Sequence, residues 1–215
     1  MSRFTLTNGL YLYLTPSGAY HAVSLKEDDR PRSFLQSIVK EKQTPELNIA
    51  NLKRLMDQSN EEKCMELLLH CQKLGWVQGL TERLEYPKGA LDSILPDLLD
   101  KVSASGKVLL ADDQGFYLSC NGLDHEVAEE LSALSADIAT VHERRSALLM
   151  SNMGLSSHAW SLVDASGNSN VGFWPLYIGD NRFVISICGV PYFNRPEFVT
   201  LIWALSTRYA EEAMA

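Results

Sequence analysis

The chain has 215 residues, of which 46% are hydrophobic and 21% are charged, with a net charge of -8. This composition is typical of a globular protein, and the length allows one or two domains. The apolar runs, such as Val108 to Ala111, are far short of the ~20 residues needed to span a bilayer, and the N-terminus lacks the apolar core of a signal peptide. We therefore expect a cytoplasmic protein.

The negative charge is unevenly distributed along the sequence. Residues 1–85 contain 11 Lys and Arg against 11 Asp and Glu, whereas residues 86–215 contain 8 against 16. An acidic domain repels nucleic acid and anionic lipid. The second half is therefore expected to have a protein as its partner, and nucleic acid is disfavoured there.

The first 42 residues predict a β-hairpin followed by a helix. Two runs rich in aromatic and apolar residues, 10–14 and 19–25, flank a Thr-Pro-Ser-Gly segment typical of turns. Pro31 then favours the start of a helix over residues 33–42, and Thr44 followed by Pro45 favours a second helix start.

A third helix and a short wing complete the predicted first domain. Ser59 and Glu62 have the spacing of a capping box, and Gly75 is placed to end the helix. Two short apolar runs in residues 76–86 follow directly and resemble the wing of a winged-helix fold. We therefore predict a winged-helix-like module over residues 1–85.

Such an outline raises DNA binding as an alternative function. The third helix would present its first turn, residues 60–63, to the major groove, and this turn contains Glu61 and Glu62. Carboxylates facing phosphates weaken DNA binding, which depends on Lys and Arg. We therefore favour a module for protein contact or spacing.

The second half predicts a different order of elements, beginning with a helix from residue 88 that contains Pro96, where we expect a kink or restart. Two strands follow, joined by an Asp-x-Gly turn. A long helix from Asp124 to about Met150 is next. Three strands over residues 158–188 and a final helix over residues 196–213 complete the domain.

One stretch of the long helix is unusually rich in small side chains. These would let another helix or a sheet approach closely, and they are our candidates for a dimer interface: Ala128, Ser132, Ala133, Ser135, Ala136 and Ala139.

The order helix, two strands, long helix, three strands, helix resembles the roadblock/dynein-light-chain family over residues 88 to about 212. The segments that carry the resemblance are Gly106-Lys-Val-Leu-Leu-Ala-Asp-Asp-Gln-Gly115 and Asp124-His-Glu-Val-Ala-Glu-Glu-Leu-Ser-Ala-Leu134. It implies an α+β fold, a profilin-like α-β-α sandwich with a five-stranded, mainly antiparallel sheet. It further implies a homodimer formed through the long helix and the adjoining strand, which acts as a scaffold or regulator of Ras-like small GTPases.

Motifs for catalysis, metal or cofactor binding are not found in the sequence. It contains no phosphate loop, no G-x-S-x-G and no zinc-type spacing. The nearest approximations are His70-Cys71, Asp112-Asp113 and the segment Gly154-Leu-Ser-Ser-His158, and each is better explained as a helix, turn or loop feature. Four aromatic residues could line an apolar pocket but are more typical of a core: Trp160, Trp174, Tyr177 and Trp203.

The sequence therefore predicts two domains, residues 1–85 and 86–215, that together form a non-enzymatic homodimeric scaffold or regulator without a cofactor. The main alternative is a DNA-binding transcriptional regulator whose second domain dimerises or senses a ligand. An enzyme is the third hypothesis, which turnover abolished by changing Asp112 or His158 would support.

Overall fold

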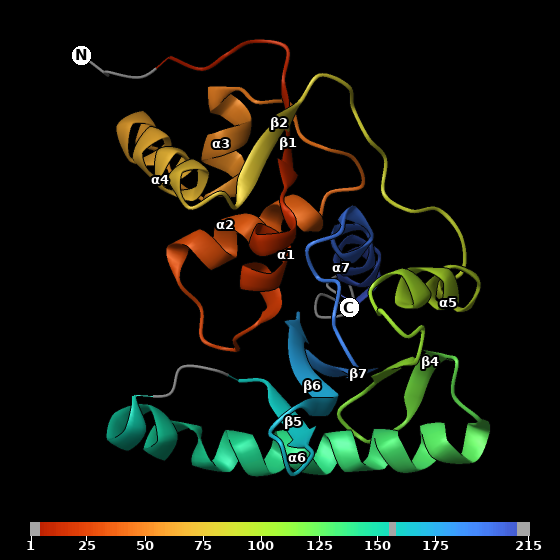
Figure 1. The fold of residues 1–215 in the computed structure, drawn as a ribbon. Helices are drawn as coiled ribbons and strands as arrows, with labels where there is room; N and C mark the ends of the chain where they lie inside the picture. The colour runs from red at the N-terminus through yellow and green to blue at the C-terminus, as the bar shows by residue number, and fades with distance from the viewer. Residues whose placement is uncertain (1–4, 155–157, 210–215) are drawn as a thin grey trace. The chain divides into compact units, whose positions relative to one another are not determined.

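The protein is described by a computed structural model that covers residues 5–154 and 158–209 (Figure 1). The chain divides into two compact units, one made of Met1–Lys88 with Phe198–Ala215 and the other of Gly89–Glu197. The first transition along the chain lies three residues beyond the predicted boundary, after residue 88 instead of 85. The second transition, at which the chain returns to the first unit from Phe198, was not predicted, because the final helix was expected in the second domain.

The first unit contains four helices and a two-stranded antiparallel sheet before the chain leaves it. Their bounds are β1 (Tyr11–Leu14), α1 (Pro16–Val23), α2 (Arg30–Val39), α3 (Ile49–Leu55), α4 (Glu61–Lys73) and β2 (Val77–Leu80). Strand β1 pairs with β2, so that Tyr11 lies opposite Leu80 and Leu14 opposite Val77.

The predicted hairpin at the N-terminus is wrong, because its second run forms helix α1. The Thr15 side chain accepts a hydrogen bond from the backbone N–H of Gly18 at 3.1 Å, and Pro16 occupies the first helical position. Threonine followed by proline suits a helix start as well as a turn. The strand paired with β1 comes instead from residues 77–80, far along the chain.

The third predicted helix is present as α4, although its N-cap is Asn60 rather than Ser59. Asn60 accepts a hydrogen bond from the N–H of Lys63 at 3.1 Å. The predicted wing is only half formed, because residues 77–80 are a strand and residues 81–86 are not. The winged-helix-like character of the first unit is therefore not confirmed.

The final helix, α7 (Pro196–Tyr209), contributes aromatic side chains to the core of the first unit. The Trp203 ring lies edge-on to Tyr13 with 5.8 Å between centroids, and its Nε1 donates to the backbone oxygen of Glu41 at 2.8 Å. Phe198 lies against Tyr20. The helix was assigned to the second domain from its position in the sequence, and these contacts correct that assignment. Its predicted end at residue 213 lies outside the described residues.

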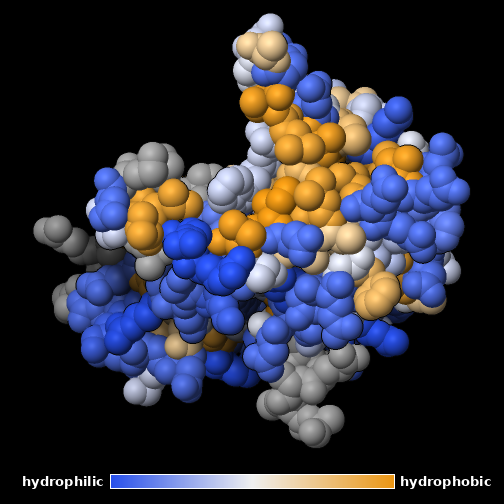
Figure 2. Space-filling view, turned by 90° about the horizontal axis from the view of Figure 1, so that it is seen from below, coloured by the Kyte–Doolittle hydropathy of each residue, from blue (hydrophilic) through white to orange (hydrophobic). Residues whose placement is uncertain are grey.

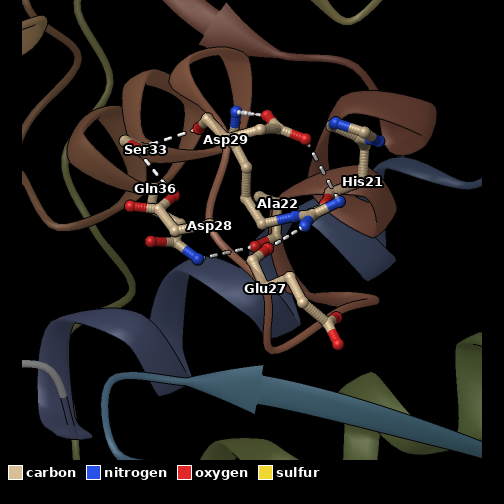
Figure 3. A network of polar contacts seen from close by, with 8 residues as sticks. His21, Ala22, Glu27, Asp28, Asp29, Ser33 and Gln36 are labelled. Atoms are coloured by element: carbon tan, nitrogen blue, oxygen red, sulfur yellow. Dashed lines mark hydrogen bonds and ion pairs between the residues drawn. The ribbon is translucent and has the colours of Figure 1, made fainter. Parts of the chain in front are cut away.

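A network of polar contacts joins α1, the loop after it and α2 in the first unit (Figure 3). A buried arginine, Arg32, makes several of these contacts. The Arg32 side chain is 2% exposed, donates from Nε to the backbone oxygen of His21 at 3.0 Å and donates from Nη1 to that of Glu27. Its guanidinium also lies 3.8 Å from the Asp29 carboxylate. Because an arginine has several donors in a fixed plane, one side chain holds both ends of this loop.

The second unit is built on a five-stranded antiparallel sheet in the order β4-β3-β7-β6-β5. Its elements are α5 (Leu91–Lys101), β3 (Val108–Ala111), β4 (Tyr117–Asn121), α6 (His125–Met153), β5 (Trp160–Val163), β6 (Ser169–Ile178) and β7 (Asn181–Cys188). The predicted α+β class, the element order and the five-stranded sheet are confirmed. Helix α5 is continuous through Pro96, so of the predicted kink or restart the restart is absent.

Helix α6 runs along one face of this sheet, and α5 lies beside β3 and β4 on the other side (Figure 1). The core between α6 and the sheet is centred on Ala139, Phe173 and Val184, with Leu131 and Ile138 packed at its margin. The side of α6 turned away from the sheet is therefore left uncovered by the described residues of this unit.

Candidate protein-contact surface

The outer side of α6 carries four exposed apolar side chains, each seven residues from the next. Val127, Leu134, Val141 and Leu148 are 47%, 39%, 46% and 53% exposed. Positions seven apart lie almost above one another on an α-helix, because seven residues make nearly two turns. The four side chains therefore form one apolar stripe that drifts around the helix by about 20° per interval, and we call it the outer stripe.

The length of α6 places part of this stripe beyond the sheet. Its 29 residues extend for about 44 Å at ~1.5 Å per residue, whereas five strands spaced ~4.8 Å apart span about 20 Å. On the side of the molecule that bears α6, hydrophobic residues gather in patches bordered by hydrophilic ones (Figure 2).

The small residues predicted for the dimer interface lie on the opposite side of α6. Ala128, Ser132, Ser135, Ala136 and Ala139 are all less than 9% exposed, and of the six candidates Ala133 alone is exposed. They face the sheet of their own chain. In the structure, the close approach that these small residues allow is made by the sheet of their own chain.

The turn between β3 and β4 shows why the side chains on α6 must be small there. Ser132 donates to the backbone oxygen of Gly115 at 2.7 Å. A Cβ atom added at Gly115 would lie 3.2 Å from the Cα of Ala133 and 3.5 Å from the Cβ of Ala136, and Gly115 has a φ of +88°. Larger side chains at Ser132 or Ala136 would separate the helix from this turn, whereas Gly115 approaches Ala133 only at its backbone, and the Ala133 side chain is exposed.

Charged side chains border the outer stripe with opposite signs at its two ends. Glu126, Glu130 and Asp137 lie in the N-terminal part of α6, whereas Arg144 and Arg145 lie towards its C-terminal end, and all five are exposed. A second α6 packed antiparallel would bring the carboxylates of one helix beside the guanidinium groups of the other.

The edge strand β5 extends the apolar surface next to α6. All four of its residues are exposed, and Trp160, Leu162 and Val163 are 39%, 48% and 59% exposed. It pairs with β6 and is the last strand in its sheet. An exposed apolar edge strand is a template for pairing with another chain. The surface we consider therefore consists of the outer stripe and β5.

A polar network joins α6 to β6 and β7 beneath this surface. The guanidinium of Arg182 lies 2.9 Å from the Glu143 carboxylate and donates to the Thr140 hydroxyl at 3.2 Å. The Tyr177 hydroxyl donates to the other Glu143 oxygen at 3.2 Å. These contacts fix the rotation of α6 about its axis on the sheet. They therefore also keep the side chains of the outer stripe pointing away from the sheet.

The residues considered for catalysis have structural contacts instead. Asp112 accepts from the backbone N–H groups of Gln114 and Phe116 at 3.0 and 2.9 Å, as expected for a turn residue. Cys71 is buried, and burial raises the pKa of its thiol to about 11, whereas its neighbour His70 is exposed. Ser156 and Ser157 lie outside the described residues.

A Glu-His-Tyr chain on the surface was not anticipated from the sequence. The Tyr117 hydroxyl lies 2.8 Å from His125 Nδ1, and His125 Nε2 lies 3.4 Å from the Glu129 carboxylate. The His125 and Glu129 side chains are 69% and 62% exposed. Since water surrounds the imidazole and the carboxylate, the arrangement lacks the dry, enclosed setting in which catalytic groups act.

The four aromatic residues considered for a ligand pocket do not come together. Trp160 and Trp174 line an apolar pocket of about 490 Å³ with Val190 and Pro191. Tyr177 belongs to the Glu143 network, and Trp203 is part of the first unit. Within residues 5–154 and 158–209, no group of three or more His, Cys, Asp or Glu side chains could hold a metal ion.

The helices in the part of the chain that the structure describes are all too short or too polar to cross a membrane. No protein-family model matches the sequence, and no curated protein does.

Three solved structures are similar to part of the chain. A roadblock/LC7 domain from Streptomyces avermitilis is 15% identical, with a TM-score of 0.37, over 59% of this chain and 98% of that one. MglB with a tetrameric arrangement is 17% identical, with a TM-score of 0.35, over 60% and 96%. The gliding protein mglB from Thermus thermophilus is 16% identical, with a TM-score of 0.36, over 59% and 96%. At these values the likeness establishes neither membership of a family nor a function.

Proposed function

We propose that this protein is a non-enzymatic scaffold or regulator that acts as a homodimer, with two copies joined through the outer stripe of α6 and strand β5. The observation that carries the proposal is the outer stripe itself. Helices that pack along one another bury two apolar positions in every seven residues, and the outer stripe supplies one exposed apolar position in each heptad. A stripe of this length exposed to water favours burial against a partner.

A second copy of the chain fits this surface because it supplies a matching stripe and opposite charges. A twofold axis midway between Leu134 and Val141 would place these two residues opposite each other across the interface. The same axis would place Glu130 opposite Arg145 of the second copy. This pair of Glu130 and Arg145 would occur twice, once on each side of the axis.

We further propose a Ras-like small GTPase as the protein that the dimer holds or regulates. The support for this step is the resemblance of residues 88 to about 212 to the roadblock/dynein-light-chain family. The excess of acidic residues in the second half favours a protein partner with a basic face.

Light scattering coupled to size-exclusion chromatography tests the dimer with two adjacent substitutions. Leu134→Glu places a charge within the outer stripe, where burial on association would be costly, so we expect a monomer at micromolar concentration. Ala133→Glu also adds a carboxylate at an exposed position, but it points about 100° away around the helix. It should leave the mass of the dimer unchanged.

The same pair of variants discriminates between the two possible faces of α6. A monomeric Ala133→Glu variant together with a dimeric Leu134→Glu variant would place the interface on the side first inferred from the small residues. A wild-type chain that is monomeric at micromolar concentration would contradict the proposed homodimer. Circular dichroism of each variant checks that its helices remain folded.

A further inference from the structure

Two histidines join α6 to the start of β5. His142 of α6 is 3% exposed, and its Nε2 lies 3.1 Å from Nδ1 of His158, two residues before β5. The His142 ring is also edge-on to the rings of His158 and Trp160, with centroids 5.1 and 5.3 Å away. The edge strand is thus attached to the helix by an imidazole pair and an indole.

With both rings neutral, the hydrogen bond between the histidines is best satisfied in one particular tautomer. The Nδ1 of His142 is buried and has no hydrogen-bond partner among the described residues. A proton on this nitrogen would be an unsatisfied buried donor, so we assign the His142 hydrogen to Nε2. His142 then donates to Nδ1 of His158, which must be unprotonated to accept.

One added proton disrupts this arrangement whichever ring receives it. A proton on His158 Nδ1 turns this acceptor into a donor that faces the Nε2–H of His142. His142 could accept from it only in the other tautomer, whose hydrogen on Nδ1 would be a buried donor without a partner among the described residues. A proton on His142 Nδ1 creates a positive charge with an unpaired donor in a buried position, which is unfavourable. Protonation of either ring therefore leaves a buried N–H of the pair without an acceptor among the described residues, and the pair is most stable when both rings are neutral.

Among the described residues, the charged groups around His142 do not compensate for a proton on its ring. Its neighbour Glu143 is already paired with Arg182 of β7 and accepts from Tyr177 of β6. From the β5 side, His158 and Trp160 contribute no negative charge. Burial has the largest effect and lowers the pKa of His142. The His158 ring lowers this pKa further, whereas Glu143 raises it.

We propose that His142 and His158 form a proton-sensitive latch that fixes β5 to α6, and that acidification releases β5 and thereby weakens the contact between two copies. The effect on the dimer rests on the proposed function, whereas the release of β5 does not. Because the folded protein holds His142 neutral, it binds fewer protons than the unfolded chain. The latch is complete above the ordinary imidazole pKa of about 6.5 and is lost as the pH falls below it.

Hydrogen exchange measured by mass spectrometry tests the latch at about pH 7.5 and about pH 5.5, after correction for the pH dependence of the chemical exchange rate. We expect amides of β5 to exchange about tenfold faster at the lower pH, while amides of β3 in the same molecule do not change. His158→Asn keeps an acceptor near the position of Nδ1 and removes the titrating ring. It should reduce the response of β5 to less than about twofold.

His70→Gln is the matched control, because it removes an exposed histidine of the first unit and should leave the full response of β5. Equal exchange of β5 at both pH values in the wild type would overturn the latch. An undiminished response in His158→Asn would also overturn it, and His142→Phe provides a second test of the same pair.

The mass of the wild-type protein, measured at both pH values, separates the two proposals. A monomer at both values with a responsive β5 supports the latch and contradicts the homodimer. A dimer at about pH 7.5 whose β5 does not respond contradicts the latch and leaves the homodimer standing.

Discussion

Arg32 shows how much of the first unit depends on one side chain. Its guanidinium is buried where it contacts two backbone oxygens and the Asp29 carboxylate (Figure 3). A buried charge is favourable only when its partners are in place, and removal of one partner leaves the others unsatisfied. Arg32 therefore explains why the connection from α1 to α2 has one fixed path.

We expect Arg32→Met to lower the free energy of unfolding by about 3 kcal/mol. Methionine retains much of the apolar stem but leaves the oxygens of His21 and Glu27 without their donor. Urea denaturation measures the change. Arg30→Met, at the exposed first position of the same helix, should alter stability by less than about 0.5 kcal/mol. Equal losses in both variants would show that the buried contacts contribute little.

At the scale of the element, α6 has two sides with separate roles. Its small residues allow the helix to lie close to the β3–β4 turn, and its outer stripe remains exposed. The charges beside the stripe are expected to select an antiparallel partner, because parallel copies would place like charges next to each other.

A charge exchange tests this arrangement of the two helices. Glu130→Arg alone should weaken the dimer about tenfold, since two arginines would then face each other across the proposed interface. Adding Arg145→Glu restores opposite charges and should recover most of the affinity. Sedimentation equilibrium at low salt measures both dissociation constants. If the double variant dissociates as readily as the single variant, the antiparallel register is incorrect.

At the scale of the whole molecule, the proposed function requires that dimerisation and partner binding belong to one mechanism. We expect the wild-type protein to bind at least one purified Ras-like GTPase in one nucleotide state more tightly than in the other. Leu134→Glu should reduce that affinity about tenfold if the partner contacts both copies. Biolayer interferometry against a panel loaded with GDP or a GTP analogue measures the difference. If no GTPase of the panel binds, the proposed GTPase partner is contradicted. The proposed homodimer is tested separately by light scattering.

The sequence was sufficient for the second unit's sheet and long helix, because their signals are local. Turn residues such as Gly115 and a helix start at Asp124 are recognised within a few positions. It was insufficient for α1, since Thr15 and Pro16 favour a turn and a helix start equally. The choice between them depends on β2, which pairs with β1 from far along the chain.

The rotation of α6 about its own axis is the clearest case of what only the tertiary structure decided. The sequence alone determined that this helix has one side of small residues and another with larger apolar residues. Either side could have faced the sheet. Contact with the β3–β4 turn settled the choice, because the close approach of Gly115 admits only small side chains. The seven-residue spacing of Val127, Leu134, Val141 and Leu148 was visible in the sequence. That these four side chains are exposed follows only from the sheet covering the other side of the helix.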